Sequence, residues 1–132
     1  MKYLLDTDVC IYLIRNRSEK LRAVFNRHKP GDIGISVITL FELAYGVYRS
    51  QFPARNRALL EQFLQPLAVV EFDANDADTC GRIRAELAAR GQPIGAYDLQ
   101  IAAQALTRKL RLVTNNRREF ARVPGLRIEN WL

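Results

Sequence analysis

Short apolar runs alternate along the chain with longer stretches in which apolar residues recur every three or four positions. The apolar runs predict four short strands and a weaker fifth, at Tyr3–Leu5, Ile33–Ile35, Ala68–Phe72, Leu110–Val113 and Leu126–Ile128. The stretches between them predict helices, at Asp8–Arg15, Glu19–His28, Ser36–Arg49, Arg55–Leu64, Asn75–Arg90 and Gly95–Arg108, with a short turn at Arg117–Phe120. Strands that alternate with helices favour an α/β fold of three layers, with helices on both faces of a parallel sheet.

No repeat or linker divides the chain, and its 132 residues match the usual size of one domain. We therefore predict a single domain over residues 1–132. No apolar run approaches the roughly 18 residues that a membrane span needs, and the start Met1–Asp6 lacks the organisation of a signal peptide. We expect a cytoplasmic protein without membrane association, in which Cys10 and Cys80 are buried, reduced thiols.

Positive charge predominates in the composition. The chain has 20 lysine and arginine residues against 14 aspartate and glutamate residues, a net charge of +6. Sixteen of the basic residues are arginine, which suits bidentate phosphate contact better than lysine does, although a GC-rich genome would also favour arginine codons. The excess charge points to a polyanionic partner.

Acidic and amide side chains follow two of the predicted strands. Asp6 and Asp8 come directly after the first strand, and Asn116 follows the strand that ends at Val113. In a parallel α/β sheet, ligands collect at the carboxyl ends of the strands, so these are candidate site residues. Asp6 is equally well placed to be the N-cap of the next helix.

Two further carboxylates lie in apolar helices. Glu42 belongs to a stretch that is apolar nearly all round, which predicts a buried helix, and a buried carboxylate must be paired or bind metal. The alternative for Glu42 is a structural salt bridge to an arginine. Asp98 shares one helix face with Ile101, Ala102 and Ala105. The alternative for Asp98 is an acid favoured by the dipole in the first helical turn.

Three carboxylates from separate segments would repel one another if they were buried together, and a divalent cation would remove that conflict. An all-oxygen ligand set favours magnesium or manganese. His28 is the only histidine, so a two-histidine ribonuclease mechanism is excluded, and serine or cysteine triads lack a credible base. Hydrolysis of a phosphodiester by metal-activated water fits these residues best.

Five motifs, in order along the chain, closely resemble the VapC toxins of the PIN-domain family. They are Leu4–Thr7, Ile38–Leu43, Gly91–Asp98, Val113–Asn116 and Glu119–Phe120, and the ending Pro124–Trp131 also looks like that family. The resemblance spans essentially the whole chain. It implies a PIN-like fold with an acidic cluster at one edge of a parallel sheet, and Asp6, Glu42 and Asp98 match the characteristic acids, which hold the metal.

The resemblance also implies an activity and partners. It implies a toxin with endoribonuclease activity that needs magnesium or manganese and inhibits translation by cutting structured RNA. The initiator transfer RNA, cut in the anticodon stem-loop, is the substrate of members close to this pattern. It further implies a VapB-type antitoxin, a homodimer or a toxin–antitoxin hetero-oligomer, and contact with DNA only through that complex. We expect an antitoxin helix to dock on the first two helices, over Asp8–Arg15 and Glu19–His28.

The sequence departs from the family pattern at two positions. Asn116 stands where a further acid is often found, so we expect Glu119 to take its place, through water or directly. Asp8 stands where asparagine is usual and adds a negative charge. Because of Asn116, a non-catalytic RNA-binding protein of the same fold stays an alternative. A second alternative is a phosphatase of the haloacid-dehalogenase type, which Asp6 and Asp8 resemble, but that reading needs a lysine at the site.

Overall fold

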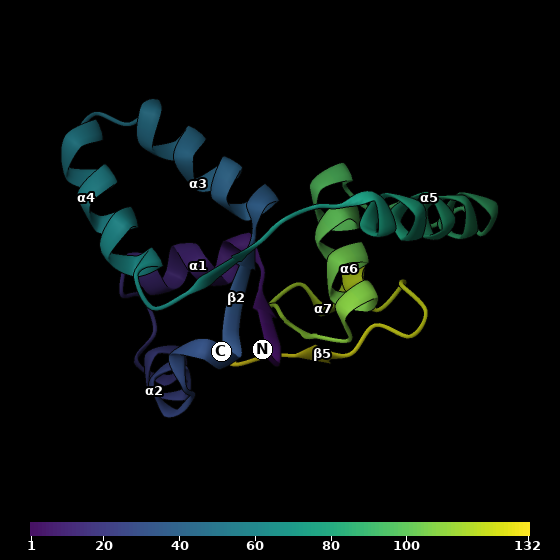
Figure 1. Ribbon diagram of the computed structural model, residues 1–132, viewed down its shortest axis with the longest axis horizontal. Helices are drawn as coiled ribbons and strands as arrows, with labels where there is room; N and C mark the ends of the chain where they lie inside the picture. The colour runs from purple at the N-terminus through teal and green to yellow at the C-terminus, as the bar shows by residue number, and fades with distance from the viewer.

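A single parallel sheet forms the centre of the computed structural model, which describes residues 1–132 (Figure 1). Its strands are β1 (Tyr3–Leu5), β2 (Ile33–Ser36), β3 (Ala68–Val70), β4 (Arg111–Val113) and β5 (Ile128–Glu129). Their order across the sheet is β3-β2-β1-β4-β5, and every neighbouring pair is parallel. The central strand β1 pairs Leu5 with Ile35 on one side and with Val113 on the other. The predicted parallel sheet is confirmed.

Helices cover both faces of this sheet, as the alternating pattern predicts. They are α1 (Thr7–Ile14), α2 (Glu19–Arg27), α3 (Val37–Tyr48), α4 (Pro53–Leu64), α5 (Ala74–Ala89), α6 (Ala96–Arg108) and α7 (Arg117–Phe120), with a short 3-10 turn at Pro30–Asp32. Successive residues of a strand point to opposite faces, so Leu4 and Leu5 belong to two different cores. Helices α1 to α4 pack on the Leu5 side, and α5 to α7 pack on the Leu4 side.

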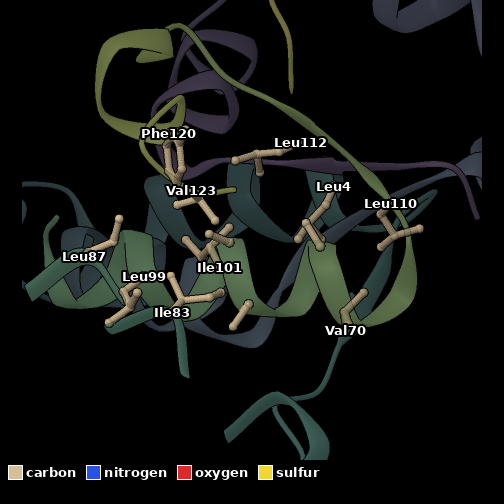
Figure 2. Packing of buried hydrophobic residues seen from close by; sticks show 13 residues of the cluster. Leu4, Val70, Ile83, Leu87, Leu99, Ile101, Leu110, Leu112, Phe120 and Val123 are labelled. Carbon is tan, nitrogen blue, oxygen red and sulfur yellow. The ribbon is translucent and has the colours of Figure 1, made fainter. Parts of the chain in front are cut away.

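The core on the Leu4 side is built mainly by α6. Ile101, Ala102, Ala103 and Ala105 are fully buried there, and their small side chains let the helix lie close to the sheet. Figure 2 shows the larger members of this core, which include Ile83 and Leu87 from α5, Leu112 from β4 and Phe120 from α7. This packing fixes the start of α6, where Asp98 lies, relative to the end of β4.

Two strands differ from the prediction by two residues at one end, and β2 and β4 each differ by one residue. β3 stops at Val70 rather than Phe72, because the Gln104 side chain donates hydrogen bonds to the carbonyls of Val70 and Glu71, each at 3.0 Å, and so takes the place of a strand neighbour. β5 begins at Ile128 rather than Leu126, because the turn at Gly125 (φ +80°) still holds Leu126.

The expectation that α3 is buried all round is wrong. Thr39, Leu43 and Val47 face the core, but Phe41, Tyr45 and Tyr48 are 52%, 59% and 76% exposed. The helix therefore has one buried face and one open aromatic face, and Glu42 lies between them, half-buried. An apolar sequence alone did not distinguish a buried face from an exposed apolar one.

Three further expectations concern residues away from the carboxylates. Cys10 is buried and Cys80 only half-buried, so burial is confirmed for the first thiol alone. We also expect His28 to be a solvated helix end rather than a ligand, but its ring stacks on Trp131 at 4.8 Å and contacts Tyr3 at the start of β1. The two chain termini therefore meet at the amino edge of the sheet (Figure 1). No helix is both long and apolar enough to cross a bilayer.

Candidate active site

The carboxyl ends of β1 and β4 meet at the centre of the sheet, where the strand order reverses direction. Asp6 follows β1 and Thr114 follows β4, and the backbone N–H of Asp6 donates to the Val113 carbonyl at 3.0 Å. The Thr114 hydroxyl donates to Asp6 Oδ2. A reversal of strand order leaves a crevice at the ends of the strands, which is the usual ligand site of such sheets.

Asp6 is both a helix cap and a buried acid, so the two interpretations of its sequence position do not compete. Its Oδ1 accepts the backbone N–H of Val9 at 2.9 Å and caps α1, while only 4% of the residue is exposed. Burial raises the pKa of Asp6 to about 6, against the hydrogen bonds from Thr114 and Val9, which lower it. The negative charges of Asp8 and Glu42 raise it further. A cation nearby would remove this penalty.

Glu42 accepts a hydrogen bond from a single hydroxyl group, that of Thr7, and forms no salt bridge. The Thr7 hydroxyl donates to Glu42 Oε1 at 2.7 Å, and the Thr7 and Thr39 hydroxyl oxygens are 3.0 Å apart. None of the five salt bridges of the chain includes Glu42. The alternative of a structural ion pair with an arginine is therefore wrong, and the charge of Glu42 is left for the site.

Asp98 and Glu119 come together over Gly95 at the start of α6. Glu119 Oε1 accepts the Gly95 backbone N–H at 2.8 Å, and the Asp98 carboxyl group lies close enough for the two acids to shift each other's pKa. A Cβ atom built on Gly95 would lie 3.6 Å from Glu119 Oε1 and 3.8 Å from Asp98 Oδ2. The absence of a side chain at position 95 thus keeps the space beside both acids open.

The two partners of this pair have opposite pKa shifts. Burial, followed by the charge of Glu119, raises the pKa of Asp98 to about 7, and the charges of Asp6 and Glu42 add to the effect. The Gly95 N–H is the main cause that lowers the pKa of Glu119. The metal-free pair therefore keeps a shared proton up to about pH 7, and the opposite shifts favour Asp98 over Glu119 as its carrier.

Asn116 connects the two halves of the site. Its backbone N–H donates to the Thr114 hydroxyl at 2.9 Å, and its side-chain Nδ2 donates to Glu119 Oε2 at 3.0 Å. It also caps α7 through Glu119 N at 3.4 Å. A hydrogen-bonded path thus runs from Asp6 through Thr114 and Asn116 to Glu119. Asn116 therefore orients the Glu119 carboxylate, and the participation of both residues in the site stays a prediction.

The carboxylates are suited to a metal ion but are not assembled as a ready-made cage. No three acidic, histidine or cysteine side chains stand at ligand spacing. Asp6, Glu42 and Glu119 nevertheless all act on the pKa of Asp98 through their charge. A set of carboxylate oxygens, with two of the acids carrying raised pKa values, fits a hard divalent cation such as magnesium or manganese. Asp8 is exposed on the first turn of α1 and contributes charge nearby.

Three threonines whose hydroxyl groups support the carboxylates were missed in the sequence analysis. Thr7, Thr39 and Thr114 each lie within a resemblance motif, yet nothing in the sequence alone assigns a partner to them. Thr7 and Thr114 follow strands β1 and β4 within two residues, so their position at the carboxyl edge is the signal that was available. Their pairing with Glu42 and Asp6 depends on which strands are neighbours.

Comparison with known proteins agrees with this geometry. The PIN-domain family model matches residues 3–126. A Salmonella typhimurium protein named tRNA(fMet)-specific endonuclease VapC is 48% identical over 131 residues, which cover 99% of this chain and 98% of the relative. The chain belongs to the PIN-domain family, among its VapC ribonucleases. A Haemophilus influenzae protein named ribonuclease VapC2 is 43% identical and covers 100% of this chain and 99% of the relative.

Solved structures of VapC proteins extend the likeness to the fold. The DNA-bound VapBC structure from Salmonella typhimurium matches with a TM-score of 0.95 and 48% identity, covering 100% of this chain and 99% of that one. VapBC2 from Rickettsia felis, bound to a promoter DNA fragment, matches with a TM-score of 0.94 and 38% identity over 100% of both chains. The predicted PIN-like fold and the enzyme class, an endoribonuclease, are confirmed.

The phosphatase alternative also fails on the structure of this VapC chain. Lys2, Lys29 and Lys109 all come shortly before strands, at the amino edge of the sheet, and Lys20 lies on α2. The carboxylates lie at the opposite edge. No lysine is therefore in position to assist a phosphorylated aspartate at Asp6.

Proposed function

We propose that this VapC ribonuclease hydrolyses structured RNA with magnesium, or manganese in its place, held by Asp6, Glu42 and Asp98. The observation that carries the proposal is the concentration of negative charge at the carboxyl ends of β1 and β4, where burial and mutual repulsion raise two pKa values. Without a cation, the repulsion among these carboxylates destabilises the fold. Their side chains offer only oxygen atoms as ligands. Glu119 supplies a fourth carboxylate, which lies beside Gly95 together with Asp98.

When bound, the metal supplies a polarised phosphate and an activated water for hydrolysis. The residues of the chain prepare that chemistry. Thr114 and Thr7 donate hydrogen bonds that orient the Asp6 and Glu42 carboxylates. The Asp98–Glu119 pair holds a proton that it must release before both carboxylates can serve as metal ligands. Gly95 leaves open space beside that pair.

The substrate that we propose is the initiator transfer RNA, cut in the anticodon stem-loop. Support for the substrate comes from the relative at 48% identity, whose name gives tRNA(fMet), whereas the position of the cut rests on the resemblance to the family alone. The net charge of +6 and the arginine-rich composition suit an RNA substrate. Cleavage of this RNA would stop initiation and would make the protein a toxin in the absence of an inhibitor.

The inhibitor in this proposal is a VapB-type antitoxin, because the similar solved structures are VapBC complexes, two of them with DNA. The structure has an apolar groove that could take it. Helix α4 forms one wall of this groove, whereas only the first two helices were expected from the sequence to be the docking surface. Ile11, Ile14, Leu43, Val47, Leu59 and Leu60 line its first part, which reaches Glu42. Phe25 and Phe63 continue it towards α2. Contact with DNA is assigned to the antitoxin complex.

The test is cleavage of purified transfer RNA by the wild-type protein and by Asp98→Asn, with Asp78→Asn as the matched control. Asp78 is exposed on α5 and stands next to Thr79, which contacts Thr107 at the opposite end of α6 from Asp98. We expect magnesium-dependent cuts in the initiator transfer RNA for the wild type and for Asp78→Asn, and none for Asp98→Asn. Cuts by Asp98→Asn at the wild-type rate, or cleavage in excess chelator, would refute the metal site.

A further inference from the structure

Two arginines stand beside the acids without an acid partner of their own. Arg118 directly precedes Glu119 on α7, and Arg122 follows one turn later, where its backbone N–H donates to the Glu119 carbonyl at 3.2 Å. Arg118 is exposed and Arg122 is half-buried. Neither takes part in any salt bridge of the chain. We call these two residues the arginine pair.

The position of Arg122 is set by the loop that precedes α6. Its guanidinium Nη1 donates to the Pro93 carbonyl at 2.9 Å, two residues before Gly95, whose backbone N–H donates to Glu119. The Gly95 N–H is the main cause that lowers the pKa of Glu119, and the charge of Arg122 lowers it further. Arg122 is therefore close enough to the acids to act on them. A single hydrogen bond uses only part of the donors of a guanidinium, so the others are available to a ligand.

Folding does not account for this concentration of positive charge. Residues 117–122 contain three arginines and one acid, Glu119, whose carboxylate oxygens already accept hydrogen bonds from Gly95 and Asn116. Like charges within one helical turn repel each other. Proteins that break such a local rule usually do so at functional sites. A negatively charged ligand between Arg118 and Arg122 would remove the repulsion.

The ligand that fits best is an RNA phosphate next to the one that is cut. The carboxylates of the site repel an approaching RNA strand, and a divalent cation cancels only part of their charge. Cationic side chains at the edge of the cluster compensate for the rest. Guanidinium groups bind phosphate oxygens in a bidentate manner. Because RNA carries a phosphate at every nucleotide, a strand that is cut at the acids brings neighbouring phosphates to the arginine pair.

We propose that Arg118 and Arg122 bind the phosphates that flank the scissile phosphate and so hold the RNA strand across the acids. The inference rests on the proposed RNA substrate and names side chains that bind it. Arg122 presents its remaining donors from a position fixed by Pro93. Arg118, which is exposed, adds a second contact one turn away. Neither side chain touches the reacting bond, so the pair acts on binding of the strand and not on the chemical step.

The test measures how binding of purified transfer RNA to the protein depends on salt, by fluorescence anisotropy in chelator. The loss of one phosphate contact lowers the steepness of log K against log salt concentration by about 0.7–0.9. We expect this decrease in Arg118→Gln and in Arg122→Gln. In magnesium, both variants should raise KM for cleavage and keep kcat. Arg122→Lys should keep the wild-type slope because it keeps the charge, but should bind more weakly because lysine cannot bind phosphate in a bidentate manner.

Arg127→Gln is the matched control and should have the wild-type slope. Arg127 also donates one guanidinium hydrogen bond to a backbone carbonyl, that of Lys109, at 2.9 Å, and has no acid partner. It precedes β5 and so lies at the amino edge of the sheet, opposite the acids. Circular dichroism confirms that each variant is folded. An unchanged slope in both Arg118→Gln and Arg122→Gln, or the same decrease in Arg127→Gln, would overturn the proposal.

Two rival roles for the arginine pair predict different results. If Arg122 only pins the loop at Pro93, Arg122→Gln should lower kcat at an unchanged slope and Arg118→Gln should have no effect, which would overturn the proposal. If the pair binds an acidic segment of the antitoxin, both variants should escape rescue by a co-expressed antitoxin yet bind and cleave transfer RNA as the wild type does, which would also overturn it. A slope that both variants lower, without cleavage by the wild type, would refute the proposed function alone. Cleavage with wild-type slopes in both variants would refute the arginine pair alone.

Discussion

Neutralising Asp98 should stabilise the metal-free protein, and the gain should grow with pH. In the folded chain the pKa of Asp98 rises from 3.8 to about 7, so the folded state retains a proton that the unfolded state has lost across this window. Stability therefore falls as pH rises from about 4 to about 7, and the penalty is fully present above it. Asparagine has nearly the same shape and cannot ionise, so Asp98→Asn escapes this penalty.

The size of the effect follows from the shift. Three pKa units correspond to about 4 kcal/mol, which is an upper bound because Asp98 is only half-buried and solvent screens part of the repulsion. The opposite shift of Glu119 offsets another part. We therefore expect Asp98→Asn to raise the free energy of unfolding by about 1–3 kcal/mol at pH 8 and by much less at about pH 4.5.

The assay is urea unfolding in chelator at both pH values, followed by circular dichroism, with Asp78→Asn as the control. Asp78 is exposed, so its replacement should change stability by the same small amount at both pH values. Added magnesium should then stabilise the wild type more than Asp98→Asn, because it removes the repulsion that the variant already lacks. A destabilised Asp98→Asn at pH 8, or a gain independent of pH, would show that Asp98 is a structural residue.

Four further results are expected. Chelator should abolish RNA cleavage and magnesium or manganese should restore it, whereas calcium should bind and support cleavage poorly because its coordination is looser; full cleavage in chelator would contradict this. The cut RNA should carry a 5′-phosphate and a 3′-hydroxyl, as in-line attack by water requires, and a cyclic phosphate in end-group mapping would exclude that mechanism. Thr114→Val should raise the pKa of Asp6 above about 6 by removing a hydrogen bond that lowers it, while Thr114→Ser should leave it unchanged, as an NMR titration of the Asp6 carboxyl group in chelator would measure. Ile14→Glu, in the apolar groove, should weaken rescue by a co-expressed antitoxin and leave cleavage intact; loss of both together would show that the groove is not a separate antitoxin surface.

The sequence predicted those site residues whose position depends on a single strand or helix. Asp6 stands directly after a strand, and Asp98 shares a helix face with alanines that are fully buried. Both positions follow from the periodicity of apolar residues, which is a local property. Glu42 was chosen because its helix was expected to be buried all round, and this was partly wrong because α3 has an open aromatic face. The absence of an arginine partner still agrees with a role for Glu42 in the site.

The partners of these acids depend on contacts between distant segments. Thr114 reaches Asp6 across 108 residues, and Glu119 reaches the Gly95 backbone across 24 residues. Both contacts require β4 to pair with β1 and α7 to pack beside the start of α6. Nothing in the sequence of either segment encodes the other, because a hydroxyl or a carboxylate has the same local preferences whichever partner it meets.

The sequence by itself determined the order of strands and helices, the parallel sheet and the edge at which acids gather. These follow from the spacing of apolar residues and from the rule that parallel strands end at one edge. Only the tertiary structure decided which strands are neighbours, which acids have raised pKa values, and which apolar face of α3 stays open. Each of these depends on burial and on charge at a distance, and both are properties of the packed chain, in which residues far apart in sequence share one low-dielectric environment.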